Sequence, residues 1–413
     1  MKILKARFRI TTPMFIGEAT AARGNAVGQI QCADGVRPTA IKGVLRQVWR
    51  ALNWARVRQA HSDDETALKA LHAEEAALFG SAAQGSKSSG GKSDSGQSAV
   101  LLRVTDQRVK PAQAVDGNNG QPSQALQYLL GMGLYHFKSG LLRSHLAPGG
   151  EFTVELAMKP SMSDDQRRQL RDALMWFGLT GSLGSRARKG FGSVTLLSLT
   201  DAGEMVELPQ SPEQYRDALQ GLISPCRAVS GAPFSAVCAE TLVQVSANGQ
   251  QALELLARHG HELGLYRGYG RAGDNGERRI FGQKAEGNFA DDHDWAYAVA
   301  NGDKPHAAPR RAIFGLPHPY RLNNADNKQV SVESSTGRRA SPLIAHIHEL
   351  ANDEYLLVHL LLESQFLPAS ECVEVSAGHN KRRIQGKELT QSLDWGVLHD
   401  FLARFEKREI IDG

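Results

Sequence analysis

The sequence is poor in cysteine and contains no long apolar run. Its 413 residues include four cysteines, none in a CxxC pair and none with a histidine at zinc-finger spacing. This argues against a disulfide framework or a structural zinc site and predicts a protein of the reducing cytoplasm. No apolar segment reaches the length of a membrane span. The cations at 2, 5, 7 and 9 also argue against a secretory signal sequence.

The chain also lacks a strong excess of charge of one sign. Its formal net charge is +4, so nucleic-acid binding would have to come from local clusters of cations. The glycine-rich stretch at 179–194 contains neither GxxxxGK[ST] nor GxGxxG, and we expect no cofactor. The content of 41% apolar and 22% charged residues is ordinary for a folded soluble protein. The length predicts two domains.

The densest local cluster is the glycine-rich stretch LTGSLGSRARKGFGSV at 179–194. Glycine permits positive φ and close approach of another backbone. Free N–H groups and cations in such a loop offer donors to an anion, most plausibly phosphate. A plain turn with solvated charges is the alternative. The predicted contacts here are Gly184, Ser185, Arg186, Arg188, Lys189 and Gly190.

A second basic element is the segment AIKGVLRQVWRALNW, whose apolar residues have the spacing of a helix with one buried stripe. Thr39 is its predicted N-cap. Lys42 lies in the first turn, where the helix dipole disfavours a cation, and an anion bound at the helix start would remove that conflict. A solvated basic face is the alternative interpretation. The candidate contacts on this helix are Lys42, Gly43, Arg46 and Arg50.

The order of expected elements predicts an α+β fold. Alternating strands are expected at 2–10, 99–105, 151–159 and 194–199, and helices follow the first and third of them. Strand, helix, strand, strand, helix, strand is the βαββαβ order of a ferredoxin-like unit. We predict a degenerate second copy, with strands at 240–247, 343–348 and 355–362 and helices at 250–265 and 389–407.

The predicted organisation is therefore two ferredoxin-like domains with loop insertions. The first spans 1–200, a proline-containing connector spans 201–235, and the second domain spans 236–413. Polar inserts are expected at 82–98, 116–123 and 323–337, because these stretches contain too few apolar residues to build a core.

Several motifs, in this order along the chain, resemble the RAMP proteins of CRISPR systems. Among these proteins, they resemble the first-numbered RAMP subunit of the Cmr (type III-B) effector complex. The motifs are TPMFIG at 12–17, RPTAIKGVLRQVWRAL at 37–52, LFGS at 78–81, GSLGSRARKGFGSV at 181–194, FGLP at 314–317 and RRASPL at 338–343.

The resemblance implies two RAMP domains in a ribonucleoprotein that binds CRISPR guide RNA and captures complementary target RNA. It implies a non-catalytic subunit that caps the complex near the guide 3′ end and contacts other RAMP subunits, with target cleavage supplied by another subunit. It adds Arg338 and Arg339 as RNA contacts of the second domain, beside the cations of the helix and the loop. Possible base-stacking groups are Phe15, Tyr135, Phe191 and Tyr269, although a core role is the expected one for each.

Two other function classes stay open. One is a metal-independent endoribonuclease that processes guide RNA, which requires a histidine acid or base near a 2′-hydroxyl. His346 and His348 share one face of a strand, and a surface or interface pair is the expected role. The other class is a protein-only scaffold. The further histidine candidates are His136, His145 and His318, and an acidic run that could suggest a metal is Asp291, Asp292, His293 and Asp294.

Overall fold

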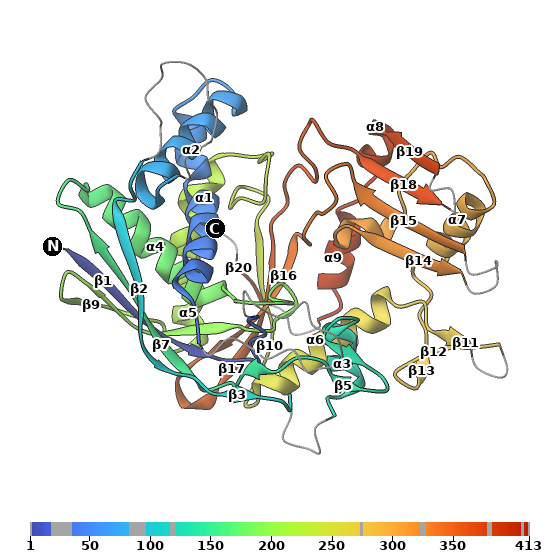
Figure 1. Cartoon of the computed structure of the whole chain (residues 1–413), viewed down its shortest axis with the longest axis horizontal. Coiled ribbons are helices and arrows are strands. Elements are labelled where there is room, and N and C mark those ends of the chain that lie inside the picture. The colour runs from blue at the N-terminus through green and yellow to red at the C-terminus, as the bar shows by residue number, and fades with distance from the viewer. Residues whose placement is uncertain are drawn as a thin grey trace, which may run out of the picture.

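The computed structural model describes residues 2–17, 35–81, 96–115, 121–272, 276–322, 328–377, 382–405 and 409–411. The predicted insert at 82–98 therefore lies mostly outside the described residues, as do 116–120 and 323–327. Figure 1 shows one sheet at the left, in blue and green, and further strands in orange and red at the right.

The first sheet has the strand order β2-β7-β1-β8-β9, and its neighbouring strands are antiparallel. Numbered along the βαββαβ unit, the first four strands lie in the order second, third, first, fourth. Helices α1 and α4 pack against the apolar face of this sheet. The bounds are β1 (Ile3–Ile10), β2 (Val100–Arg108), β7 (Glu151–Met158), β8 (Val194–Asp201), β9 (Glu204–Val206), α1 (Pro38–Gln59) and α4 (Asp164–Thr180).

Local sequence explains these elements well. In β1 every second side chain from Leu4 to Ile10 is buried, and Lys5 and Arg7 are exposed on the other face. Ser163 and Gln166 form a capping box at the start of α4. The predicted N-cap of α1 is wrong, because the helix begins at Pro38, which needs no N–H partner in the first turn.

Smaller elements complete the first half. Helix α2 packs on α1, and short strand pairs join β3 to β6 and β4 to β5. Strands β4 and β5 form a short antiparallel pair. The bounds are α2 (Asp64–Phe79), β3 (Pro111–Ala112), α3 (Gln124–Leu130), β4 (Tyr135–His136), β5 (Gly140–Leu141) and β6 (His145–Leu146).

The second sheet repeats the strand order of the first. Its order is β16-β17-β10-β20, which is again second, third, first, fourth along the chain. Helix α6 follows its first strand and α9 precedes its last. The bounds are β10 (Leu242–Gly249), α6 (Ala252–Arg267), β16 (Leu343–Glu349), β17 (Tyr355–Leu361), α9 (Gly396–Leu402) and β20 (Glu409–Ile411).

Insertions within the second half hold structure that the sequence did not predict. Between α6 and β16 lie β11 (Arg271–Ala272), β12 (Arg278–Ile280), β13 (Gln283–Lys284), α7 (Ala290–Ala300), β14 (His318–Leu322) and β15 (Lys328–Ser334). After β17 lie β18 (Val373–Ala377), β19 (Arg382–Gly386) and α8 (Lys387–Gln391). Strands β14, β15, β18 and β19 form a separate sheet, seen at the upper right of Figure 1.

Two predictions are corrected by these insertions. The expected polar insert at 323–337 contains β15, whose alternating valines at 330 and 332 are buried in the core. The expected helix at 389–407 is two short helices, α8 and α9, separated by a turn. Both errors arise where a short element gains its stability from tertiary contacts and not from a long local pattern.

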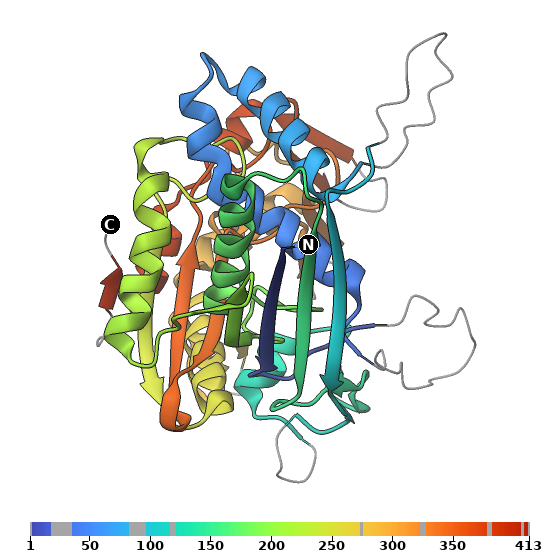
Figure 2. The same ribbon diagram turned by 90° about the vertical axis from the view of Figure 1, so that its left-hand side faces the viewer.

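The predicted connector at 201–235 holds helix α5 (Pro212–Ile223), which fills the junction between the two halves. Its Tyr215, Leu219 and Ile223 share one buried cluster with Trp176 of α4 and Val358 of β17. Figure 2 shows α5 beside the orange strands of the second sheet. The halves are thus joined by a continuous apolar core. Within the described parts of the chain, no helix is both long and apolar enough to cross a membrane.

Candidate nucleic-acid interface

The glycine-rich loop between α4 and β8 is packed tightly against its neighbours. Gly184 has φ of 89°, and a Cβ there would lie 2.6 Å from the Phe15 carbonyl oxygen. Gly192 has φ of 67°, and a Cβ there would lie 2.0 Å from the Leu183 oxygen. The Ser185 N–H donates to the Phe15 oxygen at 2.9 Å. These glycines are therefore required by close backbone approach.

The same loop joins the two sheets. Lys189 forms a parallel bridge with Ala345 of β16, and the Ala345 N–H donates to the Arg188 oxygen at 3.0 Å. Further along, the Ile347 N–H donates to Ser193 Oγ at 3.1 Å. The loop thus continues hydrogen bonding from the first half to the edge of the second sheet.

Two of the three loop cations are tied to backbone oxygens. Arg186 donates from Nε to the Leu130 oxygen at 2.8 Å and from Nη2 to the Met132 oxygen at 3.0 Å, so it holds the end of α3. Arg188 donates to the Ser341 oxygen. Burial, together with the nearby Arg339 charge, lowers the pKa of Arg188 to about 10. Both arginines have a structural role in the loop.

Lys189 differs from its neighbours. The residue is half-buried, and its Nζ has no hydrogen-bond acceptor among the described residues and lies 5.8 Å from the centre of the Tyr128 ring. Burial lowers its pKa to about 7, with smaller effects from the charges of Arg267 and Arg186. The charges of Lys189, Arg267 and Arg186 thus repel one another, and no carboxylate among the described residues pairs with any of them. An anion would offset both the repulsion and the lost hydration.

Arg267 belongs to this group although it was not among the predicted contacts. It is the last residue of α6, and its Nη2 lies 3.1 Å from His318 Nδ1. Its guanidinium carbon lies 5.1 Å from the centre of the Phe314 ring. The sequence signal that could have found it is RGYGR, a second cluster of glycine, arginine and tyrosine directly at this helix end.

The predicted contacts on α1 divide into two kinds. Arg46 and Arg50 both bind Glu75 of α2, whose side chain is fully buried, with the Arg50 contact at 3.3 Å. Lys42 has no ion-pair or hydrogen-bond partner among the described residues, and Gly43 is exposed. The start of α1 is tied to the segment that also contacts the glycine-rich loop, because Arg37 donates to the Gly17 oxygen at 2.6 Å and the Ser185 N–H donates to the Phe15 oxygen of that segment.

The two predicted RNA contacts of the second half, Arg338 and Arg339, also differ in whether they have partners within the protein. Arg338 is exposed and has no partner in the described structure. Arg339 donates from Nε to the Phe366 oxygen at 2.6 Å and reaches Ser235 Oγ at 3.1 Å. Its backbone bridges Leu316, which brings the FGLP and RRASPL motifs together. Arg339 is thus engaged within the fold, and Arg338 is free to meet a ligand.

Most of the aromatic side chains considered for base stacking are covered by other parts of the protein. Phe15 and Phe191 are buried, as expected for core residues. One face of the Tyr269 ring carries the Arg278 guanidinium at 3.8 Å, and the His293 ring stacks on it at 3.4 Å between centres. None of these three rings presents a free face to a base, whereas Tyr135 is half-buried.

The histidine pair lies inside the junction and not at a surface. His346 and His348 are 1% and 2% exposed, and the His348 ring lies 4.4 Å from that of Tyr215. Burial lowers the pKa of His346 to about 3. The His346 ring is thus enclosed by the protein, and His348 lines the pocket at the junction with only 2% of its surface exposed.

The acidic run is part of helix α7. Its Asp292 is buried and accepts hydrogen bonds from the Arg311 Nε and the Tyr320 hydroxyl. Among the described residues, no group of three or more histidine, cysteine or acidic side chains is arranged to hold a metal. The described cysteines, Cys226, Cys238 and Cys372, are unpaired.

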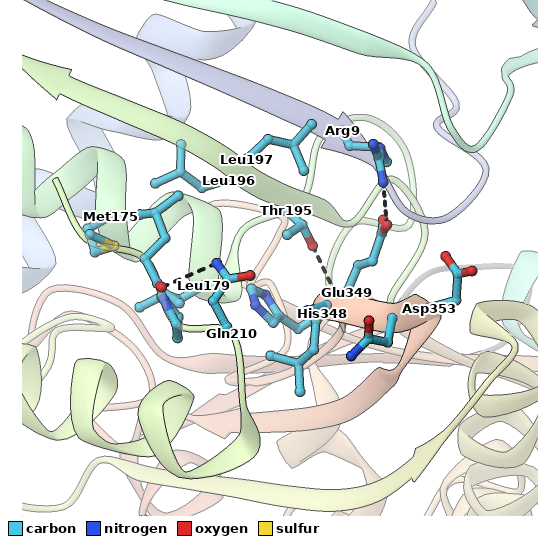
Figure 3. Close-up of a pocket in the computed structure, with 15 residues that line it drawn as sticks. Arg9, Met175, Leu179, Thr195, Leu196, Leu197, Gln210, His348, Glu349 and Asp353 are labelled. Atoms are coloured by element: carbon cyan, nitrogen blue, oxygen red, sulfur yellow. Dashed lines mark hydrogen bonds and ion pairs between the residues drawn. The ribbon is translucent and has the colours of Figure 1, made fainter. Parts of the chain in front are cut away.

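A pocket of about 240 Å³ opens at the junction, between β8 and the end of β16 (Figure 3). Arg9 lies at its edge and pairs with Glu349, and Arg9 Nη2 also lies 3.0 Å from Glu151. Thr195 Oγ1 accepts from the Glu349 N–H at 2.9 Å. Arg9 at this pocket is thus paired with carboxylates of the protein, in contrast to Lys189.

Comparison with known protein families gives a match for the first half of the chain. A model of the RAMP superfamily matches residues 7–195. This matched region contains β1, α1, α4 and the whole glycine-rich loop with Lys189, whereas Arg267 lies outside it.

The fold of the whole chain is similar to that of Cmr1 from Pyrococcus furiosus, at 18% identity and a TM-score of 0.54, covering 100% of this chain and 99% of that one. A chain of the type III-B Cmr-beta complex bound to cognate target RNA matches at 11% identity and a TM-score of 0.44, covering 98% of each chain. Cmr4 from Pyrococcus furiosus matches at 12% identity and a TM-score of 0.25, covering 50% of this chain and 100% of its own. No curated protein sequence matches.

Proposed function

We propose that the chain is an RNA-binding subunit of a type III-B CRISPR ribonucleoprotein effector complex. The RAMP match over residues 7–195 and the whole-chain similarity to the fold of Cmr1 support this assignment. In this proposal the chain has two ferredoxin-like RAMP domains, at 1–200 and 236–413, joined by the segment 201–235. The repeated strand order of the two sheets supports the duplication.

Within that complex the proposed role is to bind RNA without cleaving it. The subunit would cap the complex near the guide 3′ end, help to capture target RNA and contact other RAMP subunits. Burial of His346 and His348 supports a non-catalytic role, because general acid–base chemistry requires contact with the reacting hydroxyl. Among the predicted contacts we propose that Lys42, Gly43, Lys189 and Arg338 meet the RNA, whereas Arg46 and Arg50 hold the buried Glu75.

The observation that carries the proposal is the group formed by Lys189, Arg186 and Arg267. Three cations converge at the joint between the two halves, and Lys189 Nζ lacks an acceptor among the described residues. A phosphodiester provides the negative charge and the acceptor oxygens that this arrangement lacks. Phosphate contacts supply most of the affinity when RNA binding is independent of sequence.

The affinity for RNA is expected to fall as pH rises above 7. Lys189 in the free protein has a pKa of about 7, and a bound phosphate raises it, so binding takes up a proton. Affinity should then drop by up to roughly tenfold per pH unit until the pKa of the bound state is reached. Single-stranded RNA binding measured by fluorescence anisotropy between pH 6.5 and 9 checks this.

Two variants make the test specific. Lys189→Arg keeps a charge that does not titrate in this range and should remove the pH dependence. Lys189→Met keeps the aliphatic packing and should lower the salt dependence of log Kd by about 0.7, the value for one single-strand phosphate contact. An unchanged pH profile in Lys189→Arg, or unchanged affinity in Lys189→Met, contradicts the assignment of this site.

A further inference from the structure

A small three-stranded sheet projects from the end of α6, at the lower right of Figure 1. We call β11, β12 and β13 the basic arm. Arg271 lies directly opposite Arg279, and Arg279 lies directly opposite Lys284. Directly paired residues project from the same face of a sheet, so three cations form one row across the arm. All three are exposed.

This row is electrostatically unfavourable by itself. Like charges directly opposite one another destabilise a strand pair. Glu277 offsets part of the repulsion, with an oxygen 3.2 Å from Arg279 Nη2 and another 3.8 Å from Lys284 Nζ. Arg271 has no ion-pair or hydrogen-bond partner among the described residues. The row therefore keeps an excess of positive charge that an anionic ligand would neutralise.

The arm is held in a fixed position. Its β12–β13 turn consists of Phe281 and Gly282, with φ of 52° and 79°, as a tight two-residue hairpin requires. Phe281 keeps this costly conformation because its ring stacks on His261 at 5.5 Å and fills the space above Gly264, where a Cβ would lie 2.4 Å from it. The cations are thus presented on a rigid support.

The arm favours contact with a backbone over contact with bases. The aromatic ring at its base, Tyr269, has Arg278 on one face and His293 on the other. It therefore offers no free face for stacking, which is how proteins commonly hold unpaired bases. Exposed arginine and lysine side chains in a row suit a line of phosphates.

The arm is also linked to the Lys189 site. The Tyr128 ring lies 5.8 Å from Lys189 Nζ and 6.1 Å from the Phe281 ring, so one side chain contacts both elements. Arg267 belongs to the Lys189 group, and Arg271 follows it after three residues. A strand leaving Lys189 past the end of α6 would reach the row of cations next.

We propose that Arg271, Arg279 and Lys284 form a second phosphate-binding surface, which holds the sugar–phosphate backbone of the RNA bound at Lys189, independently of its sequence. This inference rests on the proposed RNA-binding function.

The test compares two double variants of the full chain. Arg271→Ala with Lys284→Ala removes two cations of the row and leaves the Arg279–Glu277 pair in place. Arg103→Ala with Arg108→Ala is the matched control, since both arginines are exposed on β2 and have no partner among the described residues. Binding of labelled single-stranded RNA of mixed sequence and of a homopolymer of equal length is titrated at several salt concentrations.

The arm variant should bind both RNAs roughly tenfold more weakly at low salt, with the slope of log Kd against log salt reduced by about 1.4, for two contacts at about 0.7 each. Its thermal midpoint should not fall, because repulsion within the row is relieved. The control should keep most of the wild-type affinity.

Other outcomes overturn the inference in distinguishable ways. If the wild type binds RNA and the arm variant has an unchanged slope, the arm is not an RNA surface and the Lys189 proposal stands. An equal loss in the control variant indicates diffuse attraction. If a polyglutamate peptide displaces RNA from the wild type but not from the arm variant, the arm is a surface for acidic proteins. A wild type that fails to bind RNA removes the proposed function and this inference together.

Discussion

Lowering the pH from 7.5 to 5.5 is expected to remove much of the stability of this protein. Several histidines are almost completely buried, and burial lowers the pKa of His145 to about 4 and that of His259 and His346 to about 3. Burial also keeps the pKa of His348 and His359 well below the ordinary value of 6.5. These groups are neutral in the folded chain and become protonated in the unfolded chain.

The direction follows from proton linkage. Below pH 6.5 the unfolded state binds more protons than the folded state, so stability is complete above that pH and decreases as pH falls toward the folded pKa values. One unit below 6.5, each buried histidine costs about 1.4 kcal/mol. Five such groups together reach the range of roughly 5–15 kcal/mol that is typical of a whole domain's stability.

Urea unfolding at pH 7.5, 6.5 and 5.5 measures this effect, and two histidine variants assign it. Neither ring nitrogen of His145 has a hydrogen-bond partner in the described structure, so His145→Leu removes a titrating group without removing a hydrogen bond. It should retain more stability than the wild type at pH 5.5. His136→Leu changes an exposed histidine and should follow the wild type. A free energy of unfolding that is flat between pH 7.5 and 5.5 contradicts the account of the histidines.

Replacing both Arg46 and Arg50 with alanine is expected to cost about 3–5 kcal/mol of stability. Glu75 is fully buried, and these two arginines are the cations that pair with it. Removing them leaves a buried carboxylate uncompensated, which is among the most destabilising single changes in a protein interior. Helix α2 would lose its ionic connection to α1.

A third substitution separates this structural role from RNA binding. Adding Glu75→Leu removes the unpaired buried carboxylate and should restore most of the lost stability. The triple variant should then bind RNA with nearly wild-type affinity, since both arginines already serve Glu75. A double variant that keeps its stability and loses RNA affinity would contradict this structural role and support Arg46 and Arg50 as RNA contacts, as the sequence predicted.

This pair of arginines shows where sequence reasoning reaches its limit. Helical spacing placed Lys42, Arg46 and Arg50 on one face, and the helix is present. Their partner Glu75 lies on the next helix, and nothing in the local pattern distinguishes it from Glu74, which is half exposed. A basic helix face has the same sequence signature whether an anion comes from RNA or from a buried carboxylate.

The glycine-rich loop was more predictable. Positive φ and close backbone approach are properties that glycine alone supplies cheaply, so the cluster at 181–192 indicated an unusual loop correctly. The sequence did not indicate which loop cation remains unpaired, because Arg186 is satisfied by α3 and Arg188 by Ser341. Arg267 enters the same group only through tertiary folding.

The second half was harder to predict than the first. Its βαββαβ strands are interrupted by an inserted sheet and by the basic arm, whose strands are two or three residues long. Strands of that length have no periodicity to detect. The row of Arg271, Arg279 and Lys284 exists only through their cross-strand register, which the spacing along the chain does not reveal.

The most direct measurement is a paired binding and integrity assay on the purified chain. Labelled single-stranded RNA is titrated at several salt concentrations, and the same samples are run on a denaturing gel with and without divalent metal. We predict salt-sensitive binding that depends on Lys189 and leaves the RNA intact. Discrete cleavage of the RNA, or the absence of salt-sensitive binding, would contradict a non-catalytic RNA-binding subunit.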